Sequence, residues 1–326
     1  MKLGSMKSAS RDGALVVLSD DLKTCAPAGD IARSLLDAVE HWDVAGPKLQ
    51  ALADALKAGK AEGAMPVDPA QMAACLPRAP QFVDGSAYLY HVELVRKARG
   101  ADMPPSFLDD PLMYQAVSDG FLTPTSDIVC GSEEWGIDFE GEVGVVVDDV
   151  PMGVTPDEAK QHIKLVLILN DVSLRGLIPA ELAKGFGFLQ SKPRSALSMA
   201  AVTPDALGDA WDGGKVKLPM VVHYNAKLYG QPDTGQDMQF DFPRLISHAA
   251  KTRPLAAGSI IGSGTISNRQ EGVGSCCLAE VRMIETIRDG KPSTPFMKFG
   301  DTIRIEMLDK AGHTIFGVID QQVVQG

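Results

Sequence analysis

The sequence predicts an α+β, β-rich fold, in which a mixed β-roll or sandwich domain follows a smaller N-terminal α+β domain. Two amphipathic helical patterns lie near the N-terminus. The last third of the chain instead contains several short runs in which apolar and polar residues alternate, as in half-buried strands. Residues 59–80 are rich in Pro and Gly and separate the two patterns. We therefore predict domains at residues 1–78 and 79–326.

Length and composition are those of an ordinary globular protein. The chain has 326 residues, of which 45% are hydrophobic and 22% are charged. No apolar run approaches the roughly 18 residues of a membrane span, and the N-terminus lacks the apolar core of a signal peptide, so we expect a soluble, cytoplasmic protein. The formal charge of −11 disfavours a nucleic-acid partner. The five cysteines show no metal-binding spacing and are expected to be reduced.

The N-terminal domain is expected to combine a strand with two helices. Residues 14–19 form a short apolar run that predicts the strand. Asp30 is the expected cap of an amphipathic helix that runs towards Trp42. A second helix is expected from about Pro47 to Lys60.

The segment after the domain boundary brings a carboxylate close to a histidine. Asp84 ends a short apolar run, and His91 follows seven residues later in a predicted helix over residues 86–98. Both side chains could face one cleft, although a single histidine on an amphipathic helix is more often structural. Residues 101–131 are too long for a simple connection, and they favour a lid or a substrate wall.

Residues 137–147 (IDFEGEVGVVV) carry acidic and then apolar side chains at alternate positions, which predicts one strand. Glu140 and Glu142 would then lie on one face, about 6.5 Å apart. Two unpaired carboxylates repel each other in an apolar setting, and a shared divalent cation removes that repulsion. The alternative is a solvated acidic face, which this pattern taken alone more often indicates.

Another acidic position follows a buried strand, predicted over residues 164–169 after a capped helix start at Thr155. The strand stops at Asp171, and Arg175 comes soon after. A carboxylate and a guanidinium at a sheet edge suit a functional site, but a turn aspartate beside a surface arginine is an equal alternative. The glycine-rich approach to Lys192 lacks the spacing of a phosphate-binding P-loop.

The C-terminal third is predicted to be mostly β. A hairpin over residues 218–231 is expected to turn at Asn225 and Ala226, and a helix is expected over residues 242–251. Four more strands are predicted from alternating patterns at residues 259–267, 277–286, 301–308 and 314–320. Three histidines lack acidic or thiol partners at ligand spacing and are interpreted as structural: His223, His248 and His313.

As an ordered set, these motifs resemble the fumarylacetoacetate hydrolase family. The set consists of Asp84 with His91, the E-x-E of residues 140–142, the NDxSxR of residues 170–175, the SKP of residues 191–193 and the GSGTIS of residues 262–267. The resemblance extends from about residue 80 to the C-terminus and implies the fumarylacetoacetase C-terminal fold. Residues 1–78 would be the small N-terminal domain found in a bacterial fumarylacetoacetase-like group.

The resemblance also implies a metal centre. Its carboxylate ligands match Asp84, Glu140, Glu142 and Asp171. A set of oxygen donors suits a hard cation, so the implied metal is Mg²⁺, with Ca²⁺ or Mn²⁺ as alternatives.

The remaining family positions are catalytic or substrate-binding. The catalytic positions match His91 as general base, Glu280 as the group that orients it, and Arg175 and Lys192 as oxyanion stabilisers. The substrate-binding positions match Thr265 and Arg99. The family glutamine three residues after the arginine is Ile178 here, so one polar donor is missing.

The implied activity is metal-dependent hydrolysis of a carbon–carbon bond in a β-diketo acid, such as fumarylacetoacetate or an acylpyruvate, as in aromatic amino-acid breakdown. Decarboxylases, hydratases and isomerases of 2-oxo acids are alternatives on the same scaffold. A non-catalytic homologue that keeps the metal is a third reading. The resemblance further implies a homodimer with a small-molecule substrate.

Overall fold

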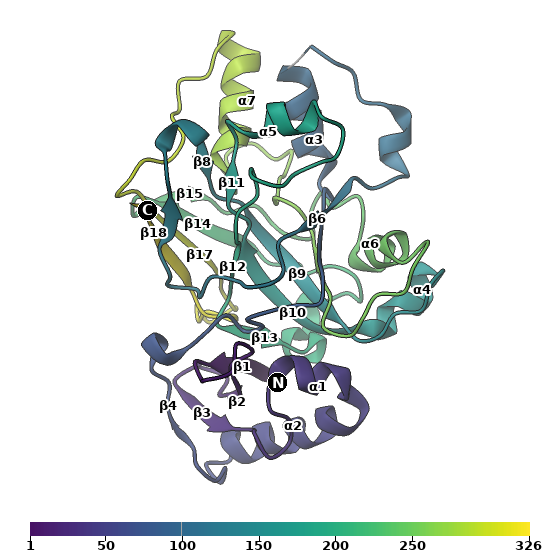
Figure 1. Ribbon diagram of the computed structural model, residues 1–326, viewed down its shortest axis with the longest axis vertical. Coiled ribbons are helices and arrows are strands. Elements are labelled where there is room, and N and C mark those ends of the chain that lie inside the picture. Colours follow the sequence, from purple (N-terminus) through teal and green to yellow (C-terminus); the bar gives the residue numbers. More distant parts are fainter. Residues whose placement is uncertain (99) are drawn as a thin grey trace.

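The structure is a computed structural model that describes residues 1–98 and 100–326, and one large mixed sheet dominates it (Figure 1). The strands of that sheet are, in spatial order, β4 (Met65–Pro66), β3 (Thr24–Pro27), β2 (Ala14–Leu18), β1 (Lys2–Met6), β13 (Ala200–Val202), β10 (Ile163–Asn170), β9 (Gly141–Val147), β16 (Ile260–Gly262), β5 (Phe82–Gly85) and β6 (Met113–Ala116), with β12 (Ala196–Leu197) also on β10. The sheet does not close into a barrel.

Two smaller sheets complete the β structure. The larger of them contains β15 (Lys227–Gly230), β14 (Met220–Tyr224), β17 (Thr302–Met307), β18 (Ile319–Gln325) and β7 (Ile128–Cys130). The other pairs β11 (Ser173–Leu174) with β8 (Ile137–Asp138). The predicted β-rich, mixed fold class is thereby confirmed.

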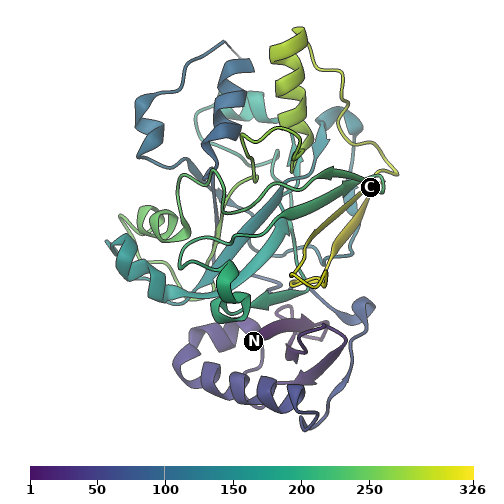
Figure 2. The ribbon, with the colours of Figure 1, turned by 180° about the vertical axis from the view of Figure 1, so that it is seen from behind.

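The α-helices lie around the sheets. They are α1 (Leu35–Glu40), α2 (Trp42–Lys57), α3 (Leu89–Ala98), α4 (Pro156–Ala159), α5 (Ile178–Leu182), α6 (Phe242–Ala249) and α7 (Leu278–Asp289). Figures 1 and 2 show α1 and α2 at one end of the long axis, and α3 and α7 side by side at the opposite end.

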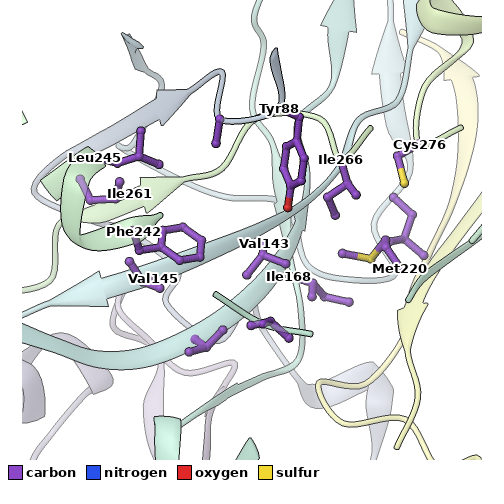
Figure 3. Close-up of a cluster of buried hydrophobic side chains, with 14 of the residues drawn as sticks. Tyr88, Val143, Val145, Ile168, Met220, Phe242, Leu245, Ile261, Ile266 and Cys276 are labelled. Atoms are coloured by element: carbon purple, nitrogen blue, oxygen red, sulfur yellow. The ribbon is translucent and has the colours of Figure 1, made fainter. Parts of the chain in front are cut away.

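The central strands β9 and β10 are buried on both faces, which explains their nearly continuous apolar sequences. On one face, Val143, Val145 and Ile168 pack with Phe242 and Ile261 in the main core (Figure 3). On the opposite face, Val146, Leu165 and Leu167 pack with apolar residues of α1 and α2. Because β1 pairs with β13, the N-terminal strands extend the same sheet.

Several predicted elements are confirmed. The strand near residue 14, the strand near residue 164 and the hairpin all form, and Asn225 and Ala226 adopt the positive φ of 49° and 61° that such a tight turn requires. The capping box at Thr155 is present, and α6 ends two residues before the predicted limit. All five cysteines are free and buried. Among the described residues, the structure contains no helix with the length and apolarity needed to cross a membrane.

The predicted starts of the first two helices were wrong. Ser34, rather than Asp30, caps α1 and accepts a hydrogen bond from the Asp37 amide at 3.1 Å. The second helix begins at Trp42 and contains Pro47. Pro47 lies in the second turn of the helix, where its missing amide leaves the Asp43 carbonyl without its intrahelical hydrogen bond.

Residues 137–147 form two strands rather than one. The Glu140 amide donates to Asn170 Oδ1 at 3.0 Å, and the Glu140 carbonyl accepts from the Asp171 amide at 3.0 Å. These bonds replace a regular strand ladder at the point where the chain leaves β8 for β9. The alternation of Asp138, Glu140 and Glu142 therefore does not place them on one strand face.

Residues 277–286 were predicted as a strand, but they belong to the helix α7. Cys277 caps it, and the Asp138 carboxylate accepts from the amides of Leu278 and Ala279 at 2.8 and 3.0 Å. Gly290, at a φ of 79°, ends the helix. The strand predicted at residues 259–267 forms only over the three residues of β16. The strand predicted at residues 314–320 was misplaced, because β18 begins at Ile319.

Candidate active site

The site begins at neighbouring strands of the large sheet. β5 carries Asp84 and β9 carries Glu142, and β16 lies between these two strands. Gly262 on β16 faces Asp84, and a Cβ atom there would collide with the Asp84 carboxylate. Glycine is thus required for the carboxylates to approach each other. The Gly264 amide then donates to Asp84 Oδ1 at 3.1 Å.

Three of the four predicted metal carboxylates come together. Asp84, Glu142 and Asp171 are buried, and each presents a ligand oxygen within 4.8 Å of the others. Burial and the charges of Asp84 and Asp171 raise the pKa of Glu142 well above its usual range. Burial and Asp171 likewise raise the pKa of Asp84 to about 8.

This group of three carboxylates is suited to a hard cation. Neither carboxylate oxygen of Glu142 has a hydrogen-bond partner among the described residues, although both are buried. A buried carboxylate without donors is costly, and a divalent cation would compensate it. The all-oxygen donor set fits Mg²⁺ or Mn²⁺.

Glu140 lies outside the group of three, because two cationic side chains hold its oxygens. Arg175 Nη2 donates to one oxygen at 2.5 Å, and Lys192 Nζ donates to the other at 2.6 Å. Burial alone would raise the pKa of Glu140, but Arg175 and Lys192 lower it below the usual range. Asp138 anchors the same arginine from the far side, at 2.9 Å from Nε.

Lys192 connects Glu140 with Asp171. Its ammonium group donates to Asp171 Oδ2 at 2.6 Å, and the hydroxyls of Tyr114 and Ser195 also donate to Asp171. Burial favours the neutral amine, but Asp171 and Glu140 outweigh burial and raise the pKa of Lys192. Lys192 is therefore a fixed positive charge beside the carboxylates.

His91 and Glu280 face each other from two helices. His91 on α3 lies with Nδ1 3.2 Å from Glu280 Oε2 on α7, and both side chains are mostly buried. The pairing places a proton on Nδ1, facing Glu280, and leaves Nε2 of His91 free to act on another group. The helical state of residues 278–289 is what brings Glu280 to this position.

Two other residues singled out from the sequence line the cavity beside His91, and a third is outside the described part of the chain. Thr265 is buried and lines the same cavity as His91 and Glu142. Ile178 begins α5 and also lines this cavity. Arg99 lies outside the described residues, so its predicted role stays a prediction.

Residues 101–131, predicted as a lid or wall, include the edge strand β6 and the short strand β7. Tyr114 on β6 lies in the cavity wall, and its hydroxyl is 2.5 Å from Asp171 Oδ2. No site role was predicted for Tyr114 from the sequence. Because β6 pairs with β5, the register that sets Tyr114 opposite Asp84 could not be read from the local pattern.

Glu181 is a further residue that the sequence did not reveal. Its carboxylate accepts hydrogen bonds from the amides of Leu189, Gln190 and Ser191 at 3.1, 2.7 and 3.0 Å, and from the Ser191 hydroxyl at 2.5 Å. The Ser191 hydroxyl and these amides lower the pKa of Glu181 to about 2. Glu181 thus fixes the backbone immediately before Lys192.

We expect Glu181→Gln to lower kcat about tenfold for the carbon–carbon bond hydrolysis that the sequence resemblance implies, while Mn²⁺ affinity stays unchanged. The amide provides one acceptor oxygen instead of two, so the segment that positions Lys192 loosens. Steady-state kinetics and calorimetry with Mn²⁺ measure both quantities. Glu158→Gln, which alters a capping carboxylate on α4, is the matched control; wild-type kcat in Glu181→Gln would contradict the prediction.

A cavity of about 430 Å³ joins these groups, and its size is typical of a small-molecule site. Asp84, Glu142 and His91 line it. Other side chains of α3, α5 and α7 are among its remaining lining residues.

Two family models match almost the whole chain. Residues 81–324 match the model described as fumarylacetoacetate (FAA) hydrolase C-terminal, and residues 1–78 match the fumarylacetoacetase N-terminal domain 2.

Individual relatives are more distant. The 2,4-didehydro-3-deoxy-L-rhamnonate hydrolase of Sphingomonas sp. (strain SKA58) is 24% identical over 60% of this chain and 61% of its own length. The oxaloacetate tautomerase YisK of Bacillus subtilis (strain 168) is 26% identical over 56% of this chain and 58% of its own. The matched part of this chain thus spans about three-fifths of each relative.

A solved structure is similar over the full chain. The maleylpyruvate hydrolase of Sphingobium sp. SYK-6, determined in complex with manganese(II) and pyruvate, superposes with a TM-score of 0.66. All of both chains is covered, at 18% identity. At this identity, the superposition demonstrates a shared fold.

Proposed function

Because this chain belongs to the fumarylacetoacetate hydrolase family, we propose that it is a metal-dependent enzyme that hydrolyses a carbon–carbon bond of a β-diketo acid such as an acylpyruvate. One observation carries the proposal. His91, which is paired with Glu280, lines the same cavity as Asp84 and Glu142, two of the three grouped carboxylates, and Glu142 lacks donors among the described residues. A base and a cation site on one cavity are the parts that this chemistry needs.

Asp84, Glu142 and Asp171 would hold the cation, for which we propose Mg²⁺ or Mn²⁺. Such a cation, when bound, polarises the substrate carbonyl and stabilises the negative charge of the leaving enolate. The maleylpyruvate hydrolase that contains manganese(II) and pyruvate supports this pairing of a hard cation with a 2-oxo acid.

Residues of this chain would activate water, stabilise the oxyanion and bind the substrate. Glu280 orients His91, which takes a proton from water so that the hydroxyl attacks the acyl carbonyl carbon. Arg175 and Lys192 present positive charge to the oxyanion, an interaction worth roughly 3 kcal/mol per well-placed donor. Thr265 would bind the substrate from the cavity wall.

The bond between the acyl carbon and the neighbouring carbon then breaks, and its electron pair goes to the leaving enolate. Lys192 keeps its proton in the presence of Asp171 and Glu140, so it gives that proton only to a stronger base such as the developing carbanion. Water has then supplied a hydroxyl to one product and, through the protein, a proton to the other.

Assays on a panel of substrates test this proposal. Acetylpyruvate, fumarylacetoacetate and oxaloacetate are incubated with the purified protein and Mg²⁺ or Mn²⁺, and both carboxylic-acid products are quantified by chromatography. We expect cleavage of a diketo acid that stops on chelation and returns with added metal. Absence of cleavage with every substrate and metal would refute the proposal.

A second candidate is tautomerisation of a 2-oxo acid. The observation that favours it is Ile178, an apolar residue on the cavity where the hydrolase pattern carries glutamine. A proton transfer develops less charge on a tetrahedral oxygen than hydrolysis does, so it needs fewer donors there. The tautomerase of B. subtilis is consistent with this chemistry on the scaffold.

Ile178→Gln tests whether a missing donor limits hydrolysis. If hydrolysis is limited by a missing donor, the variant should show a higher kcat for acetylpyruvate cleavage with little change in KM, because the donor acts in the transition state. Leu182→Gln, on the same helix at the same cavity, is the control. An unchanged or lower kcat with a reduced Tm would instead show that the amide only adds a poorly paired buried group.

A further inference from the structure

The cavity extends from the carboxylates outward between two helices. On α3, Val92, Val95 and Ala98 follow His91 on the cavity side, at the spacing of one helix face. On α7, Met283 follows Ala279 in the same way. With a rise of about 1.5 Å per residue, the α3 stripe reaches about 10 Å beyond His91.

The remaining outer walls are also mainly apolar. Leu112, Leu182, Phe188, Pro292 and Phe296 line the cavity, together with the polar Thr286 of α7. Phe188 packs edge-on against Tyr114, with the ring centroids 4.8 Å apart. Both rings line the cavity.

Among the described lining residues, the charged side chain on this apolar part of α7 is Arg282, which packs against the wall. The guanidinium carbon of Arg282 lies 4.1 Å from the Phe296 ring centroid, and Nη1 donates to the Thr294 carbonyl. Glu285 holds that segment by accepting hydrogen bonds from the amides and hydroxyls of Ser293 and Thr294 at 2.7–2.8 Å. The arginine therefore forms part of the wall.

We propose, on the basis of the proposed function, that the acyl group of the substrate is an apolar, largely unbranched chain that lies between α3 and α7. The 2-oxo-acid end would lie at the grouped carboxylates, near Arg175 and Lys192. The chain would contact Val92, Val95 and Met283. Hydrolysis adds hydroxyl to the acyl carbon and a proton to the leaving carbon, so the products are a medium-chain carboxylic acid and pyruvate.

Burial decides between this substrate and a dicarboxylate of equal length. Each methylene placed against apolar walls gains affinity, whereas a second carboxylate placed against the same apolar side chains would lose hydration. The cavity thus discriminates by the far end of the acyl group, while the inner end recognises features that all acylpyruvates share.

The test compares three substrates with the Mn²⁺-loaded protein: acetylpyruvate, hexanoylpyruvate and adipoylpyruvate, which adds a terminal carboxylate. We expect kcat/KM for hexanoylpyruvate to exceed both others by at least about tenfold. Calorimetry with His91→Ala measures the same preference as affinity, without turnover. Equal values for acetyl and hexanoyl substrates, or a preference for adipoylpyruvate, would overturn the inference.

Val95→Phe places a larger side chain one helical turn beyond His91. It should raise KM for hexanoylpyruvate at least about tenfold and leave acetylpyruvate nearly unchanged. Val44→Phe, at an exposed position of α2, is the matched control. Arg282→Met tests the alternative: loss of a strong adipoylpyruvate activity in that variant would assign Arg282 to a distal carboxylate and refute the proposal.

The outcomes separate this inference from the proposed function. If acetylpyruvate is cleaved but chain length has no effect on kcat/KM or affinity, the function stands and the apolar-chain inference fails. If hexanoylpyruvate binds tightly to His91→Ala but no acylpyruvate is cleaved by the wild type, the site preference stands and hydrolysis fails.

Discussion

His91→Ala is expected to lower kcat for carbon–carbon cleavage by about 10²–10⁴ and to leave Mn²⁺ affinity unchanged. His91 contacts Glu280, not the three grouped carboxylates, so its removal eliminates the base without altering the cation ligands. Steady-state kinetics and calorimetry with Mn²⁺ measure the two effects separately.

Two control experiments make this expectation specific to His91. Added imidazole should restore part of the activity, because the substitution opens a space beside Glu280 where the small base can bind. His313→Ala, which removes an exposed imidazole near Asp309, should behave as the wild type. Turnover close to that of the wild type in His91→Ala would assign the base to another residue.

Glu280→Gln tests the partner of that base. The amide keeps the shape of the side chain but cannot stabilise the charged imidazolium, so kcat should fall by less than in His91→Ala and KM should change little. In the double variant, the two losses should be far from additive, since both residues serve one function.

The sequence predicted the fold class better than the path of the chain at the site. Strongly apolar strands such as β9 and β10 were apparent from composition, because both faces of these strands are buried. The break before Gly141 was not, because it depends on the Asn170 side chain, which is distant in sequence. Local periodicity contains no information on such a partner.

The helix α7 shows a second limit. Glu280 and Arg282 alternate with apolar residues, which imitates a half-buried strand, yet the segment is rich in good helix formers and ends at Gly290. The start of the helix is stabilised by Asp138, again from a distant strand. Capping and propensity were the signals that could have corrected the alternation.

The separation of Glu140 from the grouped carboxylates is a third case. Spacing makes Glu140 and Glu142 equivalent, but Arg175 and Lys192 hold the first, whereas no donor among the described residues reaches the second. Ionic pairing of this kind arises only once β11 and the segment before Lys192 are placed. The residue types were therefore predictable, and their division of roles was not.

Glu142→Gln is expected to abolish Mn²⁺ binding and, at the same time, to stabilise the metal-free protein at pH 8. The wild-type carboxylate is fully buried between Asp84 and Asp171 without a donor. A neutral amide needs no proton uptake on folding at pH 8 and can donate to either neighbour. We expect the Tm of the metal-free variant to exceed that of the wild type by about 3 °C or more at pH 8.

The pH dependence has a definite sign. In the folded, metal-free wild type, the pKa of Glu142 is well above its usual range, and the pKa of Asp84 is raised to about 8. Groups with raised folded-state pKa values contribute stability that is complete below their unfolded pKa and is lost as the pH rises through the folded value. The wild-type Tm in chelator should therefore fall from about pH 5 to pH 8 more steeply than that of Glu142→Gln.

Melting curves at pH 5 and pH 8, with chelator or with Mn²⁺, give four values per protein. Mn²⁺ at pH 8 should raise the wild-type Tm, because a cation bound only to the folded state shifts the equilibrium, and it should have no effect on Glu142→Gln. Glu62→Gln, at an exposed position, controls for the loss of one charge. Undiminished Mn²⁺ affinity in Glu142→Gln would remove Glu142 from the cation site, whereas equal pH slopes in the two proteins would show that its buried charge is compensated by another group.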